Sequence, residues 1–233
     1  MFKKIFLISL ICLSSIFCNQ DLPQIDLYFE TLCPGCQEFI TTSFQDFLNN
    51  PNHSDLAKVN FHPYGNAIEV KKGDQYEFTC QHGEIECYGN TVEVCALNKL
   101  SYEDGLKYII CMENGIKTYN KNIKKALLSC IEDSDLAQNI LTCAENEEGN
   151  NLQHQVAQRT PKHDYVPWLT YNGVHSENDE DDLMNDMLGF LCALEVNKNK
   201  EVCLNYKRLL KQKDYEYCEN VTFNDYLNLK FLS

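Results

Sequence analysis

Residues 25–36, with the sequence IDLYFETLCPGC, decide the fold, because they join an alternating apolar segment to a CxxC motif. The alternation over residues 25–30 predicts a β-strand with one apolar side. After the motif the period changes to that of a helix, whose apolar face consists of Phe39, Ile40, Phe44, Phe47 and Leu48. A further segment at residues 59–64 predicts a second strand. Together these elements form a βαβ unit, in which we expect parallel strands and a right-handed crossover.

The CxxC motif, Cys33-Pro34-Gly35-Cys36, lies where the first strand passes into the helix. Cys33 is the predicted N-cap, with Pro34 at the first helical position, where its missing N–H costs nothing. The positive end of the helix dipole and the unpaired N–H groups then favour the Cys33 thiolate over the thiol. Thiolate is the attacking species in disulfide exchange, and Cys36 is close enough along the helix to resolve a mixed disulfide.

A structural disulfide and a metal-binding pair are the alternatives for Cys33 and Cys36. Zinc requires two further ligands, and the sequence contains no second CxxC motif. The nearest candidate ligands lack the paired spacing of zinc sites, and they are Cys80, His82, Cys87 and Cys95. We therefore favour redox catalysis by Cys33 and Cys36 and expect no metal site.

Length, charge and cysteine content restrict the class of protein. A chain of 233 residues is long enough for one domain with an insertion, or for two small domains. Its formal charge of −14 argues against nucleic acid and against anionic membrane surfaces as partners. Thirteen cysteines indicate an oxidising, secretory route rather than a reduced cytosol.

The N-terminus has the layout of a secretory signal peptide. A basic start precedes a nearly uninterrupted apolar run over residues 5–17, which is too short for a stable membrane span. We assign residues 1–18 to the signal peptide and residues 19–233 to the mature chain, in which we expect no membrane span. Two N-x-[ST] sequons, at Asn52 and Asn220, are candidate glycosylation sites on a secreted protein.

Residues 75–149 differ in kind from the rest of the chain. Short helical patterns there are interspersed with cysteines, which are Cys80, Cys87, Cys95, Cys111, Cys130 and Cys143. Three helices are predicted, at residues 102–112, 121–131 and 136–145. Ser101 is the predicted cap of the first of these helices, and Gly115 is its predicted end. We interpret the stretch as a disulfide-stapled helical insertion.

Val166-Pro167 precedes a predicted strand that follows the insertion. A cis proline beside the active cysteines would present backbone groups to a substrate, so we expect a cis bond and substrate binding at these two residues. Asn172-Gly173 predicts a type I′ hairpin turn. The acidic run at residues 177–182 predicts a solvated helix start, followed by an amphipathic helix and, from Asn197, a polar tail.

Residues 80–95, CQHGEIECYGNTVEVC, match every fixed position of the pattern CQHGxxECxxNxxxxC. This segment resembles the signature of the gamma-interferon-inducible lysosomal thiol reductase family. The similarity extends over nearly the whole mature chain. It includes the CxxC motif, Gln158-Arg159-Thr160, the run from Tyr165 to Trp168, Asn172-Gly173, Cys192, Cys203 and Cys218.

The resemblance implies a thioredoxin-like α/β fold and reduction of protein disulfides inside acidic endosomes or lysosomes. It implies that Cys33 is the nucleophile and Cys36 the resolving cysteine. The reaction needs no metal or nucleotide cofactor, and a small thiol is the expected reductant. We interpret the other cysteines as structural, with their connectivity open: Cys80, Cys87, Cys95, Cys111, Cys130, Cys143, Cys192, Cys203 and Cys218. No histidine is assigned a role.

Cysteine parity adds a prediction about assembly. Removal of Cys12 and Cys18 with the signal peptide leaves eleven cysteines, and setting the CxxC pair aside leaves nine. Nine cysteines cannot all pair within one chain, so one is free or joins two chains. Cys218, in the polar tail, is the candidate for a disulfide-linked homodimer.

An acidic compartment makes a demand on Cys33, because an ordinary cysteine at pH ~5 is almost entirely protonated. We therefore expect a strongly lowered Cys33 pKa. The same motif also fits a disulfide oxidase or isomerase of the secretory pathway, since direction depends on redox stabilities that the sequence does not show. A non-catalytic, disulfide-stapled binding module is the alternative from another class, and it would keep Cys33 and Cys36 bonded and buried.

Overall fold

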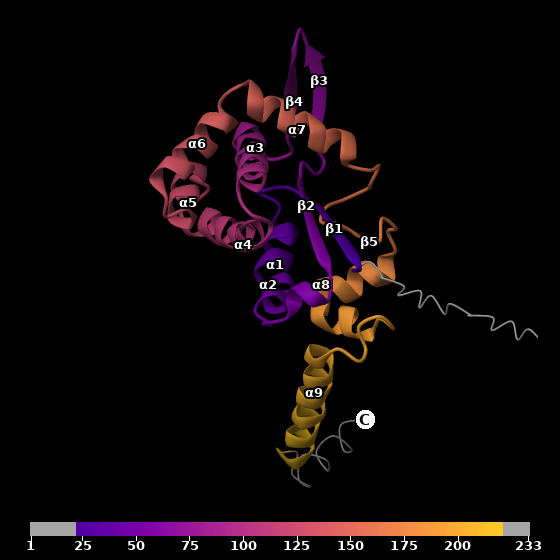
Figure 1. Cartoon of the computed structure of the whole chain (residues 1–233). Helices are drawn as coiled ribbons and strands as arrows, with labels where there is room; N and C mark the ends of the chain where they lie inside the picture. Colours follow the sequence, from indigo (N-terminus) through magenta and orange to yellow (C-terminus); the bar gives the residue numbers. More distant parts are fainter. Residues whose placement is uncertain (1–21, 221–233) are drawn as a thin grey trace, which may run out of the picture.

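The structure, a computed structural model, describes residues 22–220 of the chain, with side chains up to residue 211 (Figure 1). The expected signal peptide at residues 1–18 lies outside the described residues, and so do the side chains of Cys218 and Asn220. Within the described residues, no helix has both the length and the apolar character needed to cross a membrane.

A three-stranded sheet forms the centre of this mixed α/β protein, in the order β2-β1-β5. Strand β1 (Gln24–Phe29) pairs in parallel with β2 (Lys58–Pro63) and antiparallel with β5 (Trp168–Tyr171). The parallel pairing predicted for the first two strands is confirmed. Because β1 has a neighbour on each side, its carboxyl end, from which the CxxC motif follows, is firmly placed.

The helix predicted after the motif is wrong in one respect, because it is two helices. Helix α1 (Pro34–Thr41) ends at Thr42, and α2 (Ser43–Leu48) begins directly after it in a new direction. The hydroxyls of Thr41 and Thr42 each donate to a carbonyl one turn back, at 2.6 Å, and such bonds bend helices. The predicted apolar face is nevertheless buried, and its aromatic members Phe39, Phe44 and Phe47 are at most 1 % exposed.

The segment expected to be a helical insertion begins with a strand. Strands β3 (Ile68–Lys72) and β4 (Gln75–Thr79) form an antiparallel hairpin. Five helices follow: α3 (Glu84–Lys99), α4 (Tyr102–Thr118), α5 (Ile123–Cys130), α6 (Ser134–Ala144) and α7 (Glu147–Arg159). Figure 1 shows α3 to α6 gathered on one side of the sheet, with the hairpin projecting beyond α7. Neither α3 nor α7 was predicted, because α3 has no clear apolar face and α7 contains few apolar residues.

Helix α4 does not end where the sequence predicted. Its cap is as expected, since the Ser101 hydroxyl accepts a hydrogen bond from the Asp104 N–H at 3.2 Å. Gly115, the predicted end, lies inside the helix instead. A Cβ atom there would lie 3.1 Å from Cβ and 3.2 Å from Cα of Ala126, so the glycine allows α5 to approach α4 closely.

Within the part of the chain that the structure describes, four disulfides fasten the helices. They are Cys80–Cys87, Cys95–Cys143, Cys111–Cys130 and Cys192–Cys203. These pairs contain eight of the nine cysteines expected to be structural. The ninth is Cys218, whose side chain is outside the described residues.

The last two helices correct two further expectations. Helix α8 (Glu177–Ala193) begins in the acidic run, but Glu180 is only 7 % exposed and accepts a hydrogen bond from the Leu169 N–H at 2.8 Å. The run is therefore not simply solvated, because one of its carboxylates binds β5. The predicted polar tail forms helix α9 (Glu201–Asn220), which extends away from the rest of the molecule (Figure 1).

Candidate active site

The two cysteines of the CxxC motif lie at the N-terminus of α1, as predicted. Cys33 is the N-cap residue, and its sulfur accepts a hydrogen bond from the Cys36 N–H at 3.3 Å. Pro34 occupies the first helical position. The Cys33 N–H donates to the Glu30 carbonyl at 3.1 Å, so the nucleophile is tied to the end of β1. Both cysteines are free thiols.

Burial and hydrogen bonding separate the chemistry of the two thiols. Cys33 is 6 % exposed, whereas Cys36 is fully buried. The hydrogen bond with the Cys36 thiol, together with backbone N–H groups and the charge of His82, lowers the pKa of Cys33 to about 7, although burial opposes this. Burial, followed by the neighbouring Cys33, raises the pKa of Cys36 well above its usual range. Cys33 is therefore the group suited to attack.

Val166 and Pro167 lie against the motif, as the sequence predicted. The bond between them is cis. The Cys33 thiol donates to the Val166 carbonyl, with 3.7 Å between sulfur and oxygen. Pro167 packs over Gly35, where an added Cβ would lie 3.3 Å from the proline Cδ. The backbone of this loop is thus next to the sulfur that would form a mixed disulfide.

A buried polar network connects the motif to α3. Asn90 Oδ1 accepts hydrogen bonds from the Thr31 N–H at 2.9 Å and from the Thr31 hydroxyl at 2.5 Å. The Gln37 side chain donates to the Thr31 carbonyl at 3.0 Å. The bonds to Asn90 fix helix α3 against the loop that precedes Cys33, two residues away from the nucleophile, and the bond from Gln37 ties α1 to the same loop.

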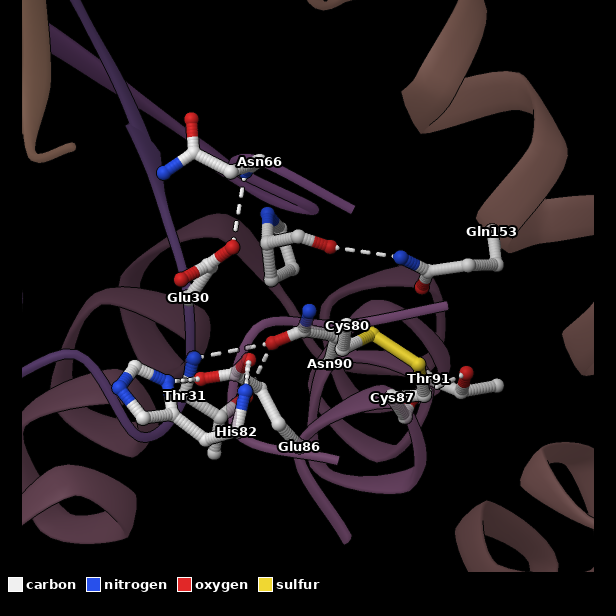
Figure 2. Close-up of a disulfide and its surroundings, with 11 residues drawn as sticks. Glu30, Thr31, Asn66, Cys80, His82, Glu86, Cys87, Asn90, Thr91 and Gln153 are labelled. Atoms are coloured by element: carbon white, nitrogen blue, oxygen red, sulfur yellow. Dashed lines mark hydrogen bonds and ion pairs between the residues drawn. A yellow bond between two sulfur atoms is a disulfide. The ribbon is translucent and has the colours of Figure 1, made fainter. Parts of the chain in front are cut away.

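Three ionisable side chains, Glu30, His82 and Glu86, lie close together beside this loop (Figure 2). Glu86 accepts hydrogen bonds from the backbone N–H of His82 at 2.8 Å and from His82 Nδ1 at 2.5 Å. Glu30 is fully buried; one of its oxygens accepts from the Asn66 N–H at 2.8 Å, and the other has no partner among the described residues. Burial, and then the Glu86 carboxylate, raise the pKa of Glu30 to about 7.

The geometry of this cluster is that of a hydrogen-bonded group rather than of a metal centre. The relevant atoms of Glu30, His82 and Glu86 lie within 4.8 Å of one another. The 2.5 Å contact between His82 and Glu86, however, is shorter than the separation of about 3.3 Å between two ligands of a tetrahedral zinc ion.

A second pair of carboxyl groups lies deeper, between α3 and α4. Glu93 and Glu113 are both fully buried. Burial raises the pKa of Glu93 to about 8, and burial together with Glu93 raises the pKa of Glu113 well above its usual range. The Thr31 hydroxyl lies 3.2 Å from Glu93 Oε2, so this pair adjoins the network beneath the CxxC motif.

Comparison with known proteins identifies the family. A profile of the family described as "Gamma interferon inducible lysosomal thiol reductase (GILT)" matches residues 24–134. A protein of Carassius auratus named "Gamma-interferon-inducible lysosomal thiol reductase" is 35 % identical over 210 residues, which cover 87 % of this chain and 79 % of that protein. The chain belongs to the gamma-interferon-inducible lysosomal thiol reductase family.

More distant relatives carry the same family name. The Mus musculus protein of that name is 32 % identical, over 77 % of this chain and 71 % of its own length. A "Gamma-interferon-responsive lysosomal thiol protein" of Arabidopsis thaliana is 28 % identical, over 86 % of this chain and 83 % of its own length. The resemblance inferred from the signature is confirmed, and it extends well beyond that segment.

Several residues at this thiol reductase site were missed by the sequence analysis. They are Glu30, Glu93 and Glu113, whose buried carboxyl groups no local pattern reveals, and His82 and Glu86. The last two are fixed positions of the family signature, so the signature itself was the available signal. Only the cysteines of the signature were given a role in the prediction. Of the candidate glycosylation sites, Asn52 is exposed.

Proposed function

We propose that the protein is a thiol reductase that reduces disulfide bonds of protein substrates in an acidic endosomal or lysosomal compartment. The observation that carries the proposal is the Cys33 thiol, which caps α1, has a lowered pKa and lies beside the fully buried Cys36 thiol. The family name supports reduction as the direction and the lysosome as the compartment.

The proposed reaction uses the two cysteines in turn. The Cys33 thiolate attacks one sulfur of the substrate disulfide, forming a mixed disulfide and releasing the first substrate thiol. Cys36 then loses its proton and attacks the Cys33 sulfur, which releases the second substrate thiol. The substrate disulfide has gained two electrons, and Cys33 and Cys36 are left as a disulfide. A small thiol supplied by the compartment would restore the dithiol form.

The cis Val166–Pro167 segment is the proposed substrate-binding element. Its backbone lies next to the Cys33 sulfur, where an extended substrate segment could pair with it. The arrangement of β1, α1 and β2, the motif at the start of α1 and the antiparallel β5 after the cis proline also support a thioredoxin-like fold with residues 75–149 as its insertion.

The four disulfides support passage through an oxidising compartment, directed by the signal peptide that we propose at residues 1–18. Eight cysteines pair within the chain, which leaves Cys218 as the residue that we propose to join two chains. A band of twice the monomer mass on a non-reducing gel, lost in Cys218→Ser, would support the homodimer. A monomer alone would contradict it.

Insulin reduction at pH ~4.5 and pH ~7 tests the proposed reaction. The intact protein is expected to be active at the lower pH, Cys33→Ser to be inactive, and Cys36→Ser to accumulate a mixed disulfide with the substrate. Inactivity of the intact protein would favour the alternative function, a non-catalytic, disulfide-stapled binding module. Efficient oxidation of reduced substrates without reduction would instead indicate the secretory oxidase or isomerase.

A further inference from the structure

The family signature places a histidine at the active site by fixing a short turn. The Gly83 N–H donates to the Cys80 carbonyl at 3.2 Å, and Gly83 adopts a φ of +85° that other residues rarely take. The Cys80–Cys87 disulfide then fastens the turn to α3. His82, inside this turn, is held by its two hydrogen bonds to Glu86 (Figure 2).

Glu30 connects this turn to the nucleophile. Its carboxyl group lies within 4.8 Å of both His82 and Glu86, while its backbone carbonyl accepts the Cys33 N–H. The cluster and Cys33 interact electrostatically. The charge of His82 favours the Cys33 thiolate, and the Cys33 thiolate disfavours the charged form of Glu30. A change of protonation in the cluster therefore changes the reactivity of the sulfur.

The charge of the cluster beside Cys33 depends on pH through Glu30. Because its pKa is raised to about 7, the Glu30 carboxyl is neutral in acid. Above neutral pH, Glu30 loses its proton, which adds a negative charge to the cluster beside Cys33. Cys36 from α1 and the buried pair Glu93 and Glu113, from α3 and α4, also carry less negative charge in acid.

A lowered pKa of about 7 does not by itself explain activity in acid. At pH 5, such a cysteine is only about 1 % thiolate. The charge of His82 is already part of this lowering, so its removal would reduce the thiolate fraction further.

We propose that His82, Glu86 and Glu30 are positioning residues that favour the Cys33 thiolate in acid and disfavour it at neutral pH. The inference rests on the proposed reductase function and assigns to the CQHGxxE part of the signature the adjustment of that reaction to an acidic compartment. His82 supplies the charge, Glu86 holds the imidazole, and Glu30 cancels the advantage when it ionises.

The rate of Cys33 alkylation by iodoacetamide, measured on the full chain from pH 4.5 to 8.5 by mass spectrometry, tests the proposal. His82→Gln is expected to lower the rate at pH 5 by roughly threefold to tenfold, with less than a twofold effect at pH 8. His82→Lys, which stays charged throughout this range, should restore the rate at pH 5. Glu30→Gln should leave the rate at pH 5 within about twofold and shift the midpoint of the profile to lower pH by about half a unit.

His154→Gln is the matched control. His154 also binds a glutamate, with Nδ1 2.9 Å from Glu69 Oε2, but this pair joins α7 to the β3–β4 hairpin. Its profile should equal that of the wild type. If His82→Gln gives the same profile as His154→Gln, the proposal is overturned. This comparison does not depend on whether the Glu30→Gln variant folds.

Two other results distinguish this proposal from a metal site and from the proposed reductase function. Stoichiometric zinc binding that is lost in His82→Gln would overturn it by identifying a metal site. Failure of the wild-type protein to reduce insulin would refute the proposed function, while the alkylation profiles would still decide whether the cluster controls Cys33.

Discussion

Thr31 is the residue through which the active-site loop is bound to α3. Its hydroxyl and its N–H both donate to Asn90 Oδ1, and all these groups are buried. A buried acceptor that loses a donor costs more than an exposed one, because water cannot replace the lost bond.

Thr31→Val is therefore expected to lower the free energy of unfolding by about 1–2 kcal/mol, although valine has nearly the same shape. Urea denaturation followed by circular dichroism measures this. Thr118→Val is the control, because the exposed Thr118 hydroxyl bonds only to the Asn114 carbonyl one turn back. Equal effects of the two substitutions would show that the Thr31 hydroxyl contributes nothing specific.

For single residues, the sequence predicts the features that depend on residues nearby in the chain. Cys33 as a helix cap and the cis Val166–Pro167 bond follow from a motif and its neighbours. The partners of Cys33 do not, because Glu30, His82 and Glu113 come from the loop after β1, the turn before α3, and α4. Only the packing of these elements brings their charges together.

The contact between α4 and α5 depends on the absence of a side chain at Gly115. Alanine inside a helix is usually more stable than glycine by roughly 0.5–1 kcal/mol. At Gly115 the added Cβ would meet the backbone of Ala126, which cannot move without displacing α5.

Gly115→Ala is thus expected to destabilise the protein by about 1–3 kcal/mol, against the helix preference. Gly105→Ala, in the same helix, is the paired control, because its Cβ would meet only the end of the Leu97 side chain at 3.2 Å. In thermal unfolding, the melting temperature should fall clearly for Gly115→Ala. For Gly105→Ala it should rise or stay unchanged. A stabilised Gly115→Ala protein would contradict the close packing of these helices.

Elements with a clear apolar period were predicted well, and the others were not. The two parallel strands and the helices near residues 121–131 and 136–145 follow from alternation and helical spacing. The break at Thr42 depends on two threonine hydroxyls that bond back to the helix, and α7 has too few apolar residues to show a period. Gly115 was misjudged because a glycine can serve close packing as well as helix termination.

For the whole molecule, the buried carboxyl groups predict greater stability in acid. A carboxyl group whose pKa is raised on folding contributes stability that is complete below about pH 4.5 and is lost as the pH rises through the folded value. For Glu93, with a folded value of about 8, this amounts to roughly 3 kcal/mol between pH 5 and pH 7.5. Glu113 changes the stability in the same direction.

Urea denaturation at pH 5 and pH 7.5 should show this difference, and Glu93→Gln should reduce it. The exposed Glu84, on the same helix, provides the control, because Glu84→Gln should keep the full dependence on pH. A wild-type protein that is more stable at pH 7.5 than at pH 5 would be the opposite of what the buried pair predicts.

A thiol reductase releases free thiols, and these can attack its own disulfides as well. The sulfurs of Cys95–Cys143 and Cys192–Cys203 belong to residues that are at most 1 % exposed, so no attacking thiol can reach them while the helices stay packed. Their reduction has to wait for local unfolding. Reduction of these two disulfides therefore depends on how often α3 separates from α6, or α8 from the start of α9, as well as on how much reductant surrounds the molecule.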